Sequence, residues 1–408
     1  MKKYSLLLCV VSFSVMNMMC TSADKSETKY QAVAERIDSL LNQHYTDDAP
    51  GYAMAICKDD SVIYSSAKGI ADVNTKARID ENTVFNIASI SKQFTAVAVL
   101  KLHELNLLSI EDSVAKFFPE FKSEIWKKVK LKHLMSHSSG IPDKRPRIDK
   151  DFMLYIVDRQ CLEYMVTLDE LKFEPGTNYD YINPTFQVLS AVVQRVSGED
   201  FEDFQQENIF NTAKMSNIRY FDPKLSIPSM AHGYICVSSV EKDDVDSDSK
   251  KDRDNLTVDY VDKNGTQWME YDYGEETFFG TKADGGIYTS VNDFIKWERA
   301  LLSNIIIADT TKALAYTPHI KVSGSRFSTY QNRPYTSYGY GWFIDEHPGR
   351  EMKIYHTGDN GGFQAYAAKY PGRGVYIIML ENRNDIDRWS IQTKIENILL
   401  EEGIINTK

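Results

Sequence analysis

A serine and a lysine stand three residues apart at the start of an apolar run, a pairing that can support acyl transfer. Ser89 and Lys92 lie within the stretch from Phe85 to Ala96. On a helix, residues i and i+3 share a face, so the amine can lie beside the hydroxyl and accept its proton. An apolar environment favours the neutral amine, the form that accepts a proton. The same spacing recurs, for example at Ser113 and Lys116, so the spacing alone does not identify a nucleophile.

A second polar pair follows a tight turn. Pro175 and Gly176 mark the turn, and Tyr181 and Asn183 come shortly after it, two residues apart. A phenol can shuttle a proton when nearby cations lower its pKa, and an amide can bind a substrate carbonyl. Packing would explain an aromatic-rich loop equally well, so this pair also depends on its context.

A third cluster stands at the end of a predicted strand. It consists of His356, Thr357 and Gly358, followed by Asp359. A glycine at this place lets a substrate approach the backbone closely. Because a single histidine is more often structural than catalytic, this cluster too is weak when it is taken alone.

Taken together and in this order, the three clusters resemble the serine β-lactamase fold and most of all its class C branch, which includes penicillin-binding-protein-like peptidases and esterases. Three further stretches support the resemblance: Leu131 to Pro142, Ala283 to Tyr288, and Tyr338 to Trp342. Several ordered motifs are hard to obtain by chance. The resemblance covers residues from about 30 to 408 and implies an α+β fold. This fold is an α/β sandwich, with an antiparallel sheet flanked by helices and an inserted all-helical domain.

The resemblance also implies a role for each cluster. Ser89 would be the acylated nucleophile, Lys92 its activating partner, and Tyr181 the proton shuttle. Backbone N–H groups of Ser89 and Asp359 would form the oxyanion hole. The remaining positions would bind the substrate: Asn183, His356, Thr357 and Gly358.

Two positions depart from the family pattern. The middle residue of Tyr-Ser-Asn is Ile182 here, and the Lys-Thr-Gly of true β-lactamases begins with His356. A charged lysine attracts the carboxylate of a β-lactam, whereas histidine is mostly neutral at pH 7. We therefore expect a serine hydrolase acting through an acyl-enzyme on esters or amides, with peptidoglycan-like or D-amino-acid peptides as the amide substrates. A true class C-like β-lactamase and a catalytically silent binding protein of the same fold are the alternatives.

The first residues predict an export signal. Lys2 and Lys3 precede an apolar stretch, Tyr4 to Met16, that is too short to span a bilayer, and small residues follow it. We expect residues 1–22 to be removed, leaving a periplasmic or secreted protein. Alternatively, a lipid on Cys20 would tether the chain to the membrane.

The composition of the chain limits the kinds of molecule that we expect it to bind. Its 408 residues, 42% of them hydrophobic, can bury a large core, and the net charge of −11 excludes nucleic acid as a partner. A small-molecule or peptide substrate is the expected partner. We expect no cofactor and no metal, because His133 and His137 have a zinc-pair spacing but lack the glutamate of a zinc protease and an obvious third ligand.

Apolar patterns predict strands near both ends of the chain and helices between them. Strand-like runs cover 51–57, 61–66, 338–344, 353–356, 363–370 and 374–380, and helical patterns cover 30–44, 88–105, 185–196 and 389–400. We therefore expect an α/β part at about 30–110 and 280–408 and a helical insert at about 111–280. Within the insert, residues 241–254 are rich in aspartate and predict a solvated, mobile loop.

Overall fold

The structure is a computed structural model of the whole chain, and its described residues are 29–143, 147–149, 154–155, 158–220, 227–239, 257–272, 282–322 and 333–407. They form two compact units. One combines the N-terminal residues up to His44 with Asp387–Thr407, and the other is Tyr45–Ile386. The predicted signal peptide, Cys20 and the acidic loop 241–254 lie outside the described residues. No helix within the described residues is long and apolar enough to span a membrane.

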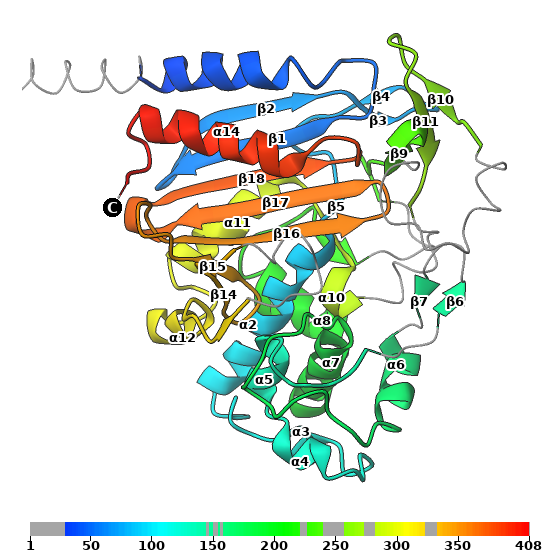
Figure 1. Cartoon of the computed structure of the whole chain (residues 1–408), viewed down its shortest axis with the longest axis vertical. Coiled ribbons are helices and arrows are strands. Elements are labelled where there is room, and N and C mark those ends of the chain that lie inside the picture. Colours follow the sequence, from blue (N-terminus) through cyan, green and yellow to red (C-terminus); the bar gives the residue numbers. More distant parts are fainter. Residues whose placement is uncertain are drawn as a thin grey trace, which may run out of the picture. The chain divides into compact units, whose positions relative to one another are not determined.

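The smaller unit consists of two helices, one over residues 29–41 and α14 (Arg388–Glu401) (Figure 1). The Asp387 side chain caps α14 by accepting the Ser390 N–H at 3.2 Å. Arg36 joins the first helix to the end of α14 through its guanidinium, which pairs with Glu401 and, at 2.8 Å, with Glu402. Both helices were predicted from apolar spacing, which places their hydrophobic residues on one face.

The larger unit is built on an antiparallel sheet of eight strands (Figure 1). In spatial order the strands are β13 (Ile320–Lys321), β14 (Thr336–Tyr338), β15 (Phe343–Asp345), β16 (Lys353–Asn360), β17 (Phe363–Tyr370), β18 (Val375–Glu381), β1 (Tyr52–Lys58) and β2 (Ser61–Lys68). The N-terminal hairpin β1–β2 pairs with the late strand β18, so both ends of the chain build the sheet. The predicted fold class, with its antiparallel sheet and flanking helices, is confirmed.

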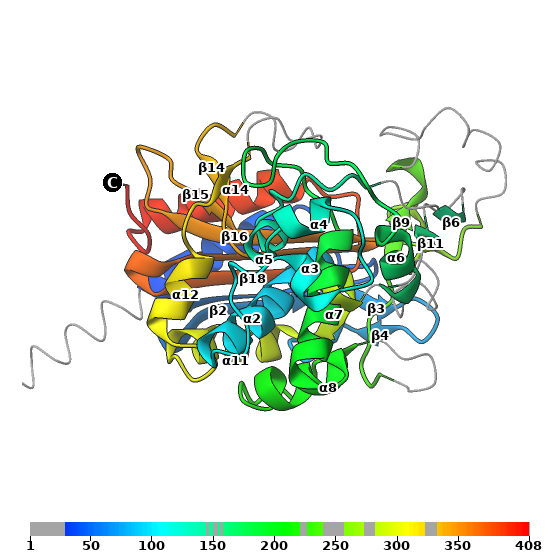
Figure 2. The same ribbon diagram turned by 90° about the horizontal axis from the view of Figure 1, so that it is seen from below.

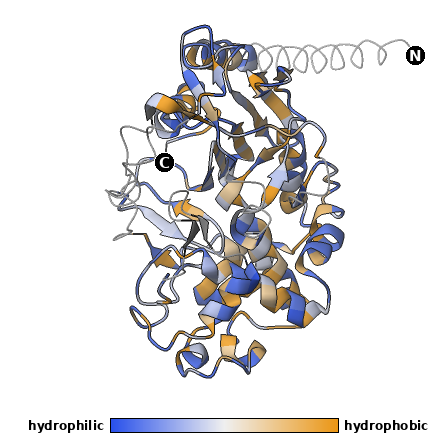
Figure 3. Cartoon of the chain, turned by 90° about the vertical axis from the view of Figure 1, so that its right-hand side faces the viewer, coloured by the Kyte–Doolittle hydropathy of each residue, from blue (hydrophilic) through white to orange (hydrophobic). Residues whose placement is uncertain are grey.

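Figure 2 shows the helices of the larger unit from below. Two of them, η1 (Ala88–Ile90) and α11 (Val291–Leu302), contact strands of the sheet. The other helices are α2 (Ser91–Glu104), α3 (Val114–Phe117), α4 (Ile125–Lys128), α5 (Leu131–Met135), α6 (Asp158–Met165), α7 (Pro184–Ser197), α8 (Phe201–Gln205), the π-helical η2 (Gln206–Phe210), α10 (Lys282–Gly285) and α12 (Asp309–Ala315). Helix α2 is buried along nearly its whole length, and α7 packs beside it. The buried residues of α2 include every position from Ser91 to Leu100 and so lie on all sides of the helix, as expected of a core helix. Figure 3 colours the whole chain by hydropathy and shows hydrophobic residues on its helices and strands.

Smaller sheets complete the larger unit. One has the order β5 (Phe85–Asn86), β12 (Ile287–Thr289), β8 (Arg219–Tyr220), and another has the order β10 (Tyr260–Val261), β11 (Gln267–Glu270), β9 (Tyr234–Cys236). Two-stranded pairs join β3 (Ile70–Asp72) to β4 (Ala77–Arg78) and β6 (Arg147–Asp149) to β7 (Leu154–Tyr155). The region 111–280 thus contains short strands in addition to the helices expected there. Strands β9 and β11 bury Tyr234, Cys236 and Trp268 in a cluster of their own.

The predicted strand 338–344 is instead a hairpin of β14 and β15. Gly339 lies so close to the Ala315 carbonyl that a Cβ would be 2.1 Å from its oxygen, and Gly341 has a φ of +85°. Both positions require glycine, and together they reverse the chain between Tyr338 and Phe343, which face each other across the hairpin. The apolar residues in the run 338–344 resemble the pattern of a single strand, so the sequence did not indicate this turn.

Candidate active site

Ser89 lies in a strained turn between β5 and α2. Ala88 has a φ of +45°, a left-handed conformation that costs about 1–2 kcal/mol for a residue with a Cβ. The buried Asn86 side chain holds this turn in place. Its Oδ1 accepts the Ala88 N–H at 2.9 Å, and its Nδ2 donates to the Gly285 carbonyl at 3.2 Å. Strain that is fixed by its surroundings is typical of functional sites.

The Lys92 amine lies at hydrogen-bond distance from the Ser89 hydroxyl. Nζ is 2.9 Å from Oγ and also donates to the Asp284 carbonyl at 2.8 Å. Lys92 is fully buried at 0% exposure, whereas Ser89 is half-buried. Thr95 donates to the Ala283 carbonyl at 2.7 Å and so ties α10 to α2. Two packed helices therefore fix the amine beside the hydroxyl, as the serine-to-lysine spacing predicted.

Tyr181 is brought to the same place by the loop before α7. Its ring centroid is 5.0 Å from Lys92 Nζ. The ring also packs on His137, with centroids 4.1 Å apart. His137 is fully buried, and its Nδ1 accepts the Ile182 N–H at 3.2 Å. His137 thus holds both the ring of Tyr181 and the backbone that follows it.

Sequence reasoning did not assign this role to His137. Its signal was present in the stretch from Leu131 to Pro142, but we considered the residue only as half of a zinc pair. In the structure, His133 Nδ1 accepts the Lys130 N–H at 3.2 Å, whereas His137 Nδ1 accepts the Ile182 N–H. Burial and the nearby Lys132 and Lys130 lower the pKa of His133 to about 4.

Asn183 stands at the N-cap position of α7, directly before Pro184. Its Oδ1 is buried and has no hydrogen-bond partner among the described residues. A buried amide oxygen without a partner is costly unless a ligand or water satisfies it. This amide can therefore contribute to substrate binding, as the family resemblance implies.

His356 lies in β16 and is nearly fully buried, at 1% exposure. Its Nδ1 is 2.6 Å from the Thr357 carbonyl oxygen, and its Nε2 is 2.9 Å from the Tyr338 hydroxyl. A carbonyl only accepts, so Nδ1 carries a proton and donates to it, while Nε2 and the Tyr338 hydroxyl form a second hydrogen bond. The Tyr338 phenol reaches His356 because the β14–β15 turn brings it beside β16.

At Gly358, strand β16 lies directly against the turn that contains Ala88 and Ser89. A Cβ on Gly358 would be 2.2 Å from the Ile87 carbonyl oxygen and 3.0 Å from the Ala88 Cβ. Two residues later, Asn360 Nδ2 donates to Asn86 Oδ1 at 3.3 Å. The backbones of Ser89 and Asp359, the two predicted oxyanion donors, therefore belong to segments that are fixed to each other. Thr357 is buried on the same strand.

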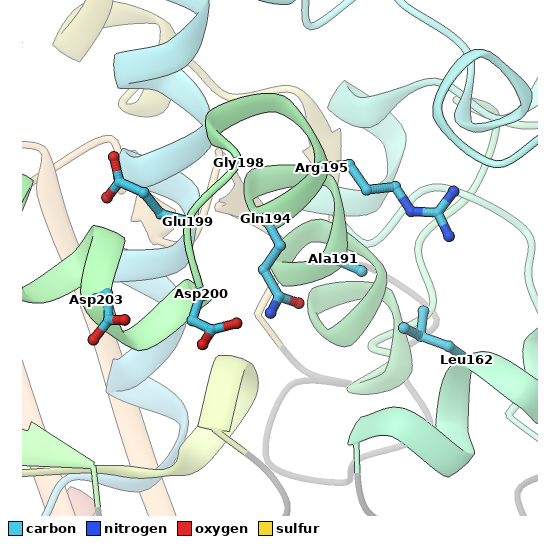
Figure 4. A pocket seen from close by; sticks show the side chains of 8 residues that line it. All are labelled: Leu162, Ala191, Gln194, Arg195, Gly198, Glu199, Asp200 and Asp203. Carbon is cyan, nitrogen blue, oxygen red and sulfur yellow. The ribbon is translucent and has the colours of Figure 1, made fainter.

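A groove with a volume of about 640 Å³ lies elsewhere, at the C-terminal end of α7 (Figure 4). Its lining residues are Leu162, Ala191, Gln194, Arg195, Gly198, Glu199, Asp200 and Asp203. Arg195 already donates to the Phe117 carbonyl at 2.7 Å and pairs with Glu120. The groove contains none of the predicted site residues.

Comparisons with known proteins identify a family and proteins of similar sequence. The family described as Beta-lactamase matches residues 33–392. Penicillin-binding protein 4* of Bacillus subtilis (strain 168) is 26% identical over 330 residues, which cover 79% of this chain and 66% of that protein. The chain therefore spans just under two thirds of the length of this relative, and 63% of Protein flp of Staphylococcus aureus (strain MW2), which is 24% identical.

Solved structures share the fold at lower sequence identity. The D-amino acid amidase of Ochrobactrum anthropi SV3, complexed with L-phenylalanine amide, has a TM-score of 0.68 at 18% identity and covers 92% of this chain and 98% of that chain. EstCE1, a hydrolase with promiscuous acyltransferase activity, has a TM-score of 0.66 at 17% identity and covers 91% of this chain and 99% of that one. At these identities the likeness shows the fold alone.

Proposed function

This chain belongs to the Beta-lactamase family, and from that membership we propose that it is a serine hydrolase working through an acyl-enzyme. The observation that carries the proposal is the 2.9 Å contact between Lys92 Nζ and Ser89 Oγ, with Tyr181 beside the amine. A nucleophile within hydrogen-bond reach of a base that other groups orient is the arrangement expected for covalent acyl transfer. Solved structures that share this fold include a D-amino acid amidase and a hydrolase with promiscuous acyltransferase activity.

In the proposed first step, the Ser89 hydroxyl attacks the substrate carbonyl. Lys92 takes the hydroxyl proton while Oγ forms a bond to the carbonyl carbon and the carbonyl oxygen becomes an oxyanion. Backbone N–H groups of Ser89 and Asp359 donate to that oxyanion. Because their two segments are packed at Gly358, the donors are held in place before the reaction.

In the proposed second step, the tetrahedral intermediate breaks the bond to the leaving group. The proton held by Lys92 returns to the leaving alcohol or amine through the Tyr181 phenol, whose ring is 5.0 Å from the amine. Water then attacks the acyl carbon, releases the acid product and restores the Ser89 hydroxyl. The Asn183 amide is the group that we assign to the substrate carbonyl or amide.

We propose esters and amides as substrates, with D-amino-acid or peptidoglycan-like peptides as the amides. A recognition lysine would supply a positive charge, whereas this chain has His356 in a bonded pair with Tyr338. Because histidine is mostly neutral at pH 7, this position supplies no permanent positive charge for a carboxylate. A β-lactam is therefore the less favoured substrate.

A panel of three substrates tests this assignment. The purified chain is offered a short-chain nitrophenyl ester, a D-amino-acid amide or D-Ala-terminated peptide, and a chromogenic cephalosporin. We expect turnover of the ester or the amide that is lost in Ser89→Ala and kept in the matched control Ser113→Ala. Fast cephalosporin turnover would favour a true β-lactamase. Absence of all turnover and of covalent labelling by a fluorophosphonate would favour a silent binding protein.

We also propose that the chain is exported, on the basis of Lys2, Lys3 and the apolar stretch that follows them. Mass spectrometry of the mature N-terminus in its native cell would find a cleaved chain in the periplasmic or secreted fraction. A lipid adduct on Cys20 would show the alternative, an anchored form. An uncleaved chain in the cytoplasm would contradict export.

A further inference from the structure

Three potential metal ligands lie on one face of the β9–β11 ribbon. Strands β9 and β11 pair antiparallel, with Glu270 opposite Tyr234. The Tyr271 N–H bonds to the Gly233 carbonyl at 2.8 Å, so the pairing continues past the strand ends. This register sets Asp272 opposite His232 and Glu270 two residues away on the same face. Figure 1 shows the two strands side by side.

The ligand atoms of these side chains converge. His232 Nδ1 is 2.9 Å from Glu270 Oε1 and 3.0 Å from Asp272 Oδ2, and all three ligand atoms lie within 4.8 Å of one another. A tetrahedral ion with bonds of about 2.0–2.2 Å holds its ligand atoms roughly 3.4 Å apart. The two distances from the imidazole nitrogen to the carboxylate oxygens are a few tenths of an ångström below this spacing.

The three side chains are partly shielded and partly open. Their exposed fractions are 27% for His232, 33% for Glu270 and 12% for Asp272. The second oxygen of Asp272 accepts the Gly233 N–H, which fixes the orientation of the carboxylate. Outer hydrogen bonds of this kind orient metal ligands in proteins. The open side leaves room for water as a further ligand.

Charge in this region favours a cation. Asp72 also lies close enough to interact electrostatically with His232. Three carboxylates therefore surround one imidazole, and even a protonated imidazole leaves an excess of negative charge. A divalent ion supplies more positive charge than one imidazolium does, and imidazole with carboxylates is a ligand set that zinc accepts.

We propose that His232, Glu270 and Asp272 bind one divalent transition-metal ion, with Zn²⁺ as the best fit to one imidazole and two carboxylates. The ion has a structural role, and no step of the proposed hydrolysis passes through it. The Tyr271 carbonyl accepts the Gly362 N–H at 2.9 Å, and a Cβ on Gly362 would be 2.0 Å from Tyr234 N. The β9–β11 pair therefore supports the tip of the β16–β17 hairpin at Gly362, which is three residues from Asp359.

Metal binding by the purified, chelator-treated full chain tests the proposal independently of hydrolysis. Isothermal titration with ZnCl₂ at neutral pH is expected to show one saturable site per chain. Glu270→Gln and Asp272→Asn should each weaken binding at least about tenfold. The matched control His133→Gln changes another half-buried histidine and should bind Zn²⁺ like the unchanged chain. Circular dichroism of each variant checks that the fold is kept.

Co²⁺ provides a second readout that a simple ion-pair cluster would not give. Cobalt bound to these side chains should produce visible absorption bands that Asp272→Asn and His232→Ala abolish. Absence of a saturable site would overturn the proposal and leave an ion-pair cluster only. Zinc binding that survives the double change Glu270→Gln and Asp272→Asn would equally overturn it, because the ion would then lie elsewhere.

Discussion

Two regions of this chain have the same serine-to-lysine spacing but differ in the burial of the lysine and in the groups that it contacts. Ser89 and Lys92 lie in a buried turn, with the amine 2.9 Å from the hydroxyl. Ser113 is the N-cap residue of α3, and Lys116 is 56% exposed and pairs with Asp112 at 2.7 Å. A carboxylate partner and solvent both keep an amine charged. The second lysine is therefore a surface cation, although its sequence spacing is identical.

The comparison teaches that burial and a third partner decide the chemistry of this motif. In the first region the Asp284 carbonyl and the Tyr181 ring meet the lysine from two other segments of the chain. In the second region the partner is Asp112, four residues before the lysine. Long-range contacts thus separate a candidate nucleophile from an ordinary helix start.

The largest expected effect comes from removing the two serine hydroxyls in turn. Ser89→Ala should lower kcat/KM for an ester substrate by about 10³-fold or more, because no covalent intermediate can form. Ser113→Ala should leave the rate unchanged, since the Ser113 side chain makes no capping hydrogen bond. Steady-state kinetics on both variants measures the difference. Equal rates in the two variants would remove the distinction between the regions.

The two lysines should differ almost as strongly. Lys92→Met keeps the length of the side chain and removes the base, so we expect kcat to fall by about 10²-fold or more. Lys116→Met removes only an exposed ion pair, worth at most about 1 kcal/mol, and should leave kcat unaltered. Kinetics together with chemical denaturation distinguishes lost catalysis from lost stability. A similar kcat in both variants would show that Lys92 is not the base.

A methyl group where β16 contacts the turn that contains Ser89 should lower stability and kcat moderately. Gly358→Ala places a Cβ 2.2 Å from the Ile87 carbonyl oxygen, and relief of this clash should cost about 1–3 kcal/mol and displace the oxyanion donors. Gly372→Ala is the control, because nothing lies within 4 Å of its Cβ position. Thermal unfolding and kcat are measured for both. A stable, fully active Gly358→Ala would argue against this arrangement.

The smallest expected effect on activity comes from His133, which accepts the N–H of Lys130, the bridge partner of Ser113, and should affect only the pH dependence of stability. Burial lowers the pKa of His133 from 6.5 to about 4. A histidine whose pKa is depressed by folding is neutral in the folded chain, so its contribution to stability is complete above pH 6.5. That contribution is lost as the pH falls from 6.5 towards 4. His133→Gln should therefore flatten the decline of Tm over this interval, and an unchanged slope would contradict the assignment.

Local patterns in the sequence were enough to predict much of the fold. The strand run 363–370 is β17, and the closing helix 389–400 is α14 to within one residue at each end. Alternating and helical apolar spacings report burial directly, so such elements can be predicted from the sequence. The β14–β15 hairpin was missed because its turn depends on the distant Ala315 carbonyl.

Only the residues that belong to sequence motifs could be predicted as parts of the site. Ser89, Lys92 and Tyr181 were named from the sequence, and the structure brings them together. The support by His137 could not be predicted, because it depends on a hydrogen bond to a residue 45 positions away. The same holds for His232 and Asp272, whose meeting depends on the register of two separated strands.

Covalent labelling tests the central claim most directly. The purified chain is treated with a fluorophosphonate, and its intact mass and proteolytic fragments are then measured by mass spectrometry. One adduct per chain, on Ser89, is expected; it should be absent from Ser89→Ala and retained in Ser113→Ala. An adduct on any other serine, or no adduct on a folded chain that hydrolyses an ester, would contradict the assignment of Ser89 as the nucleophile.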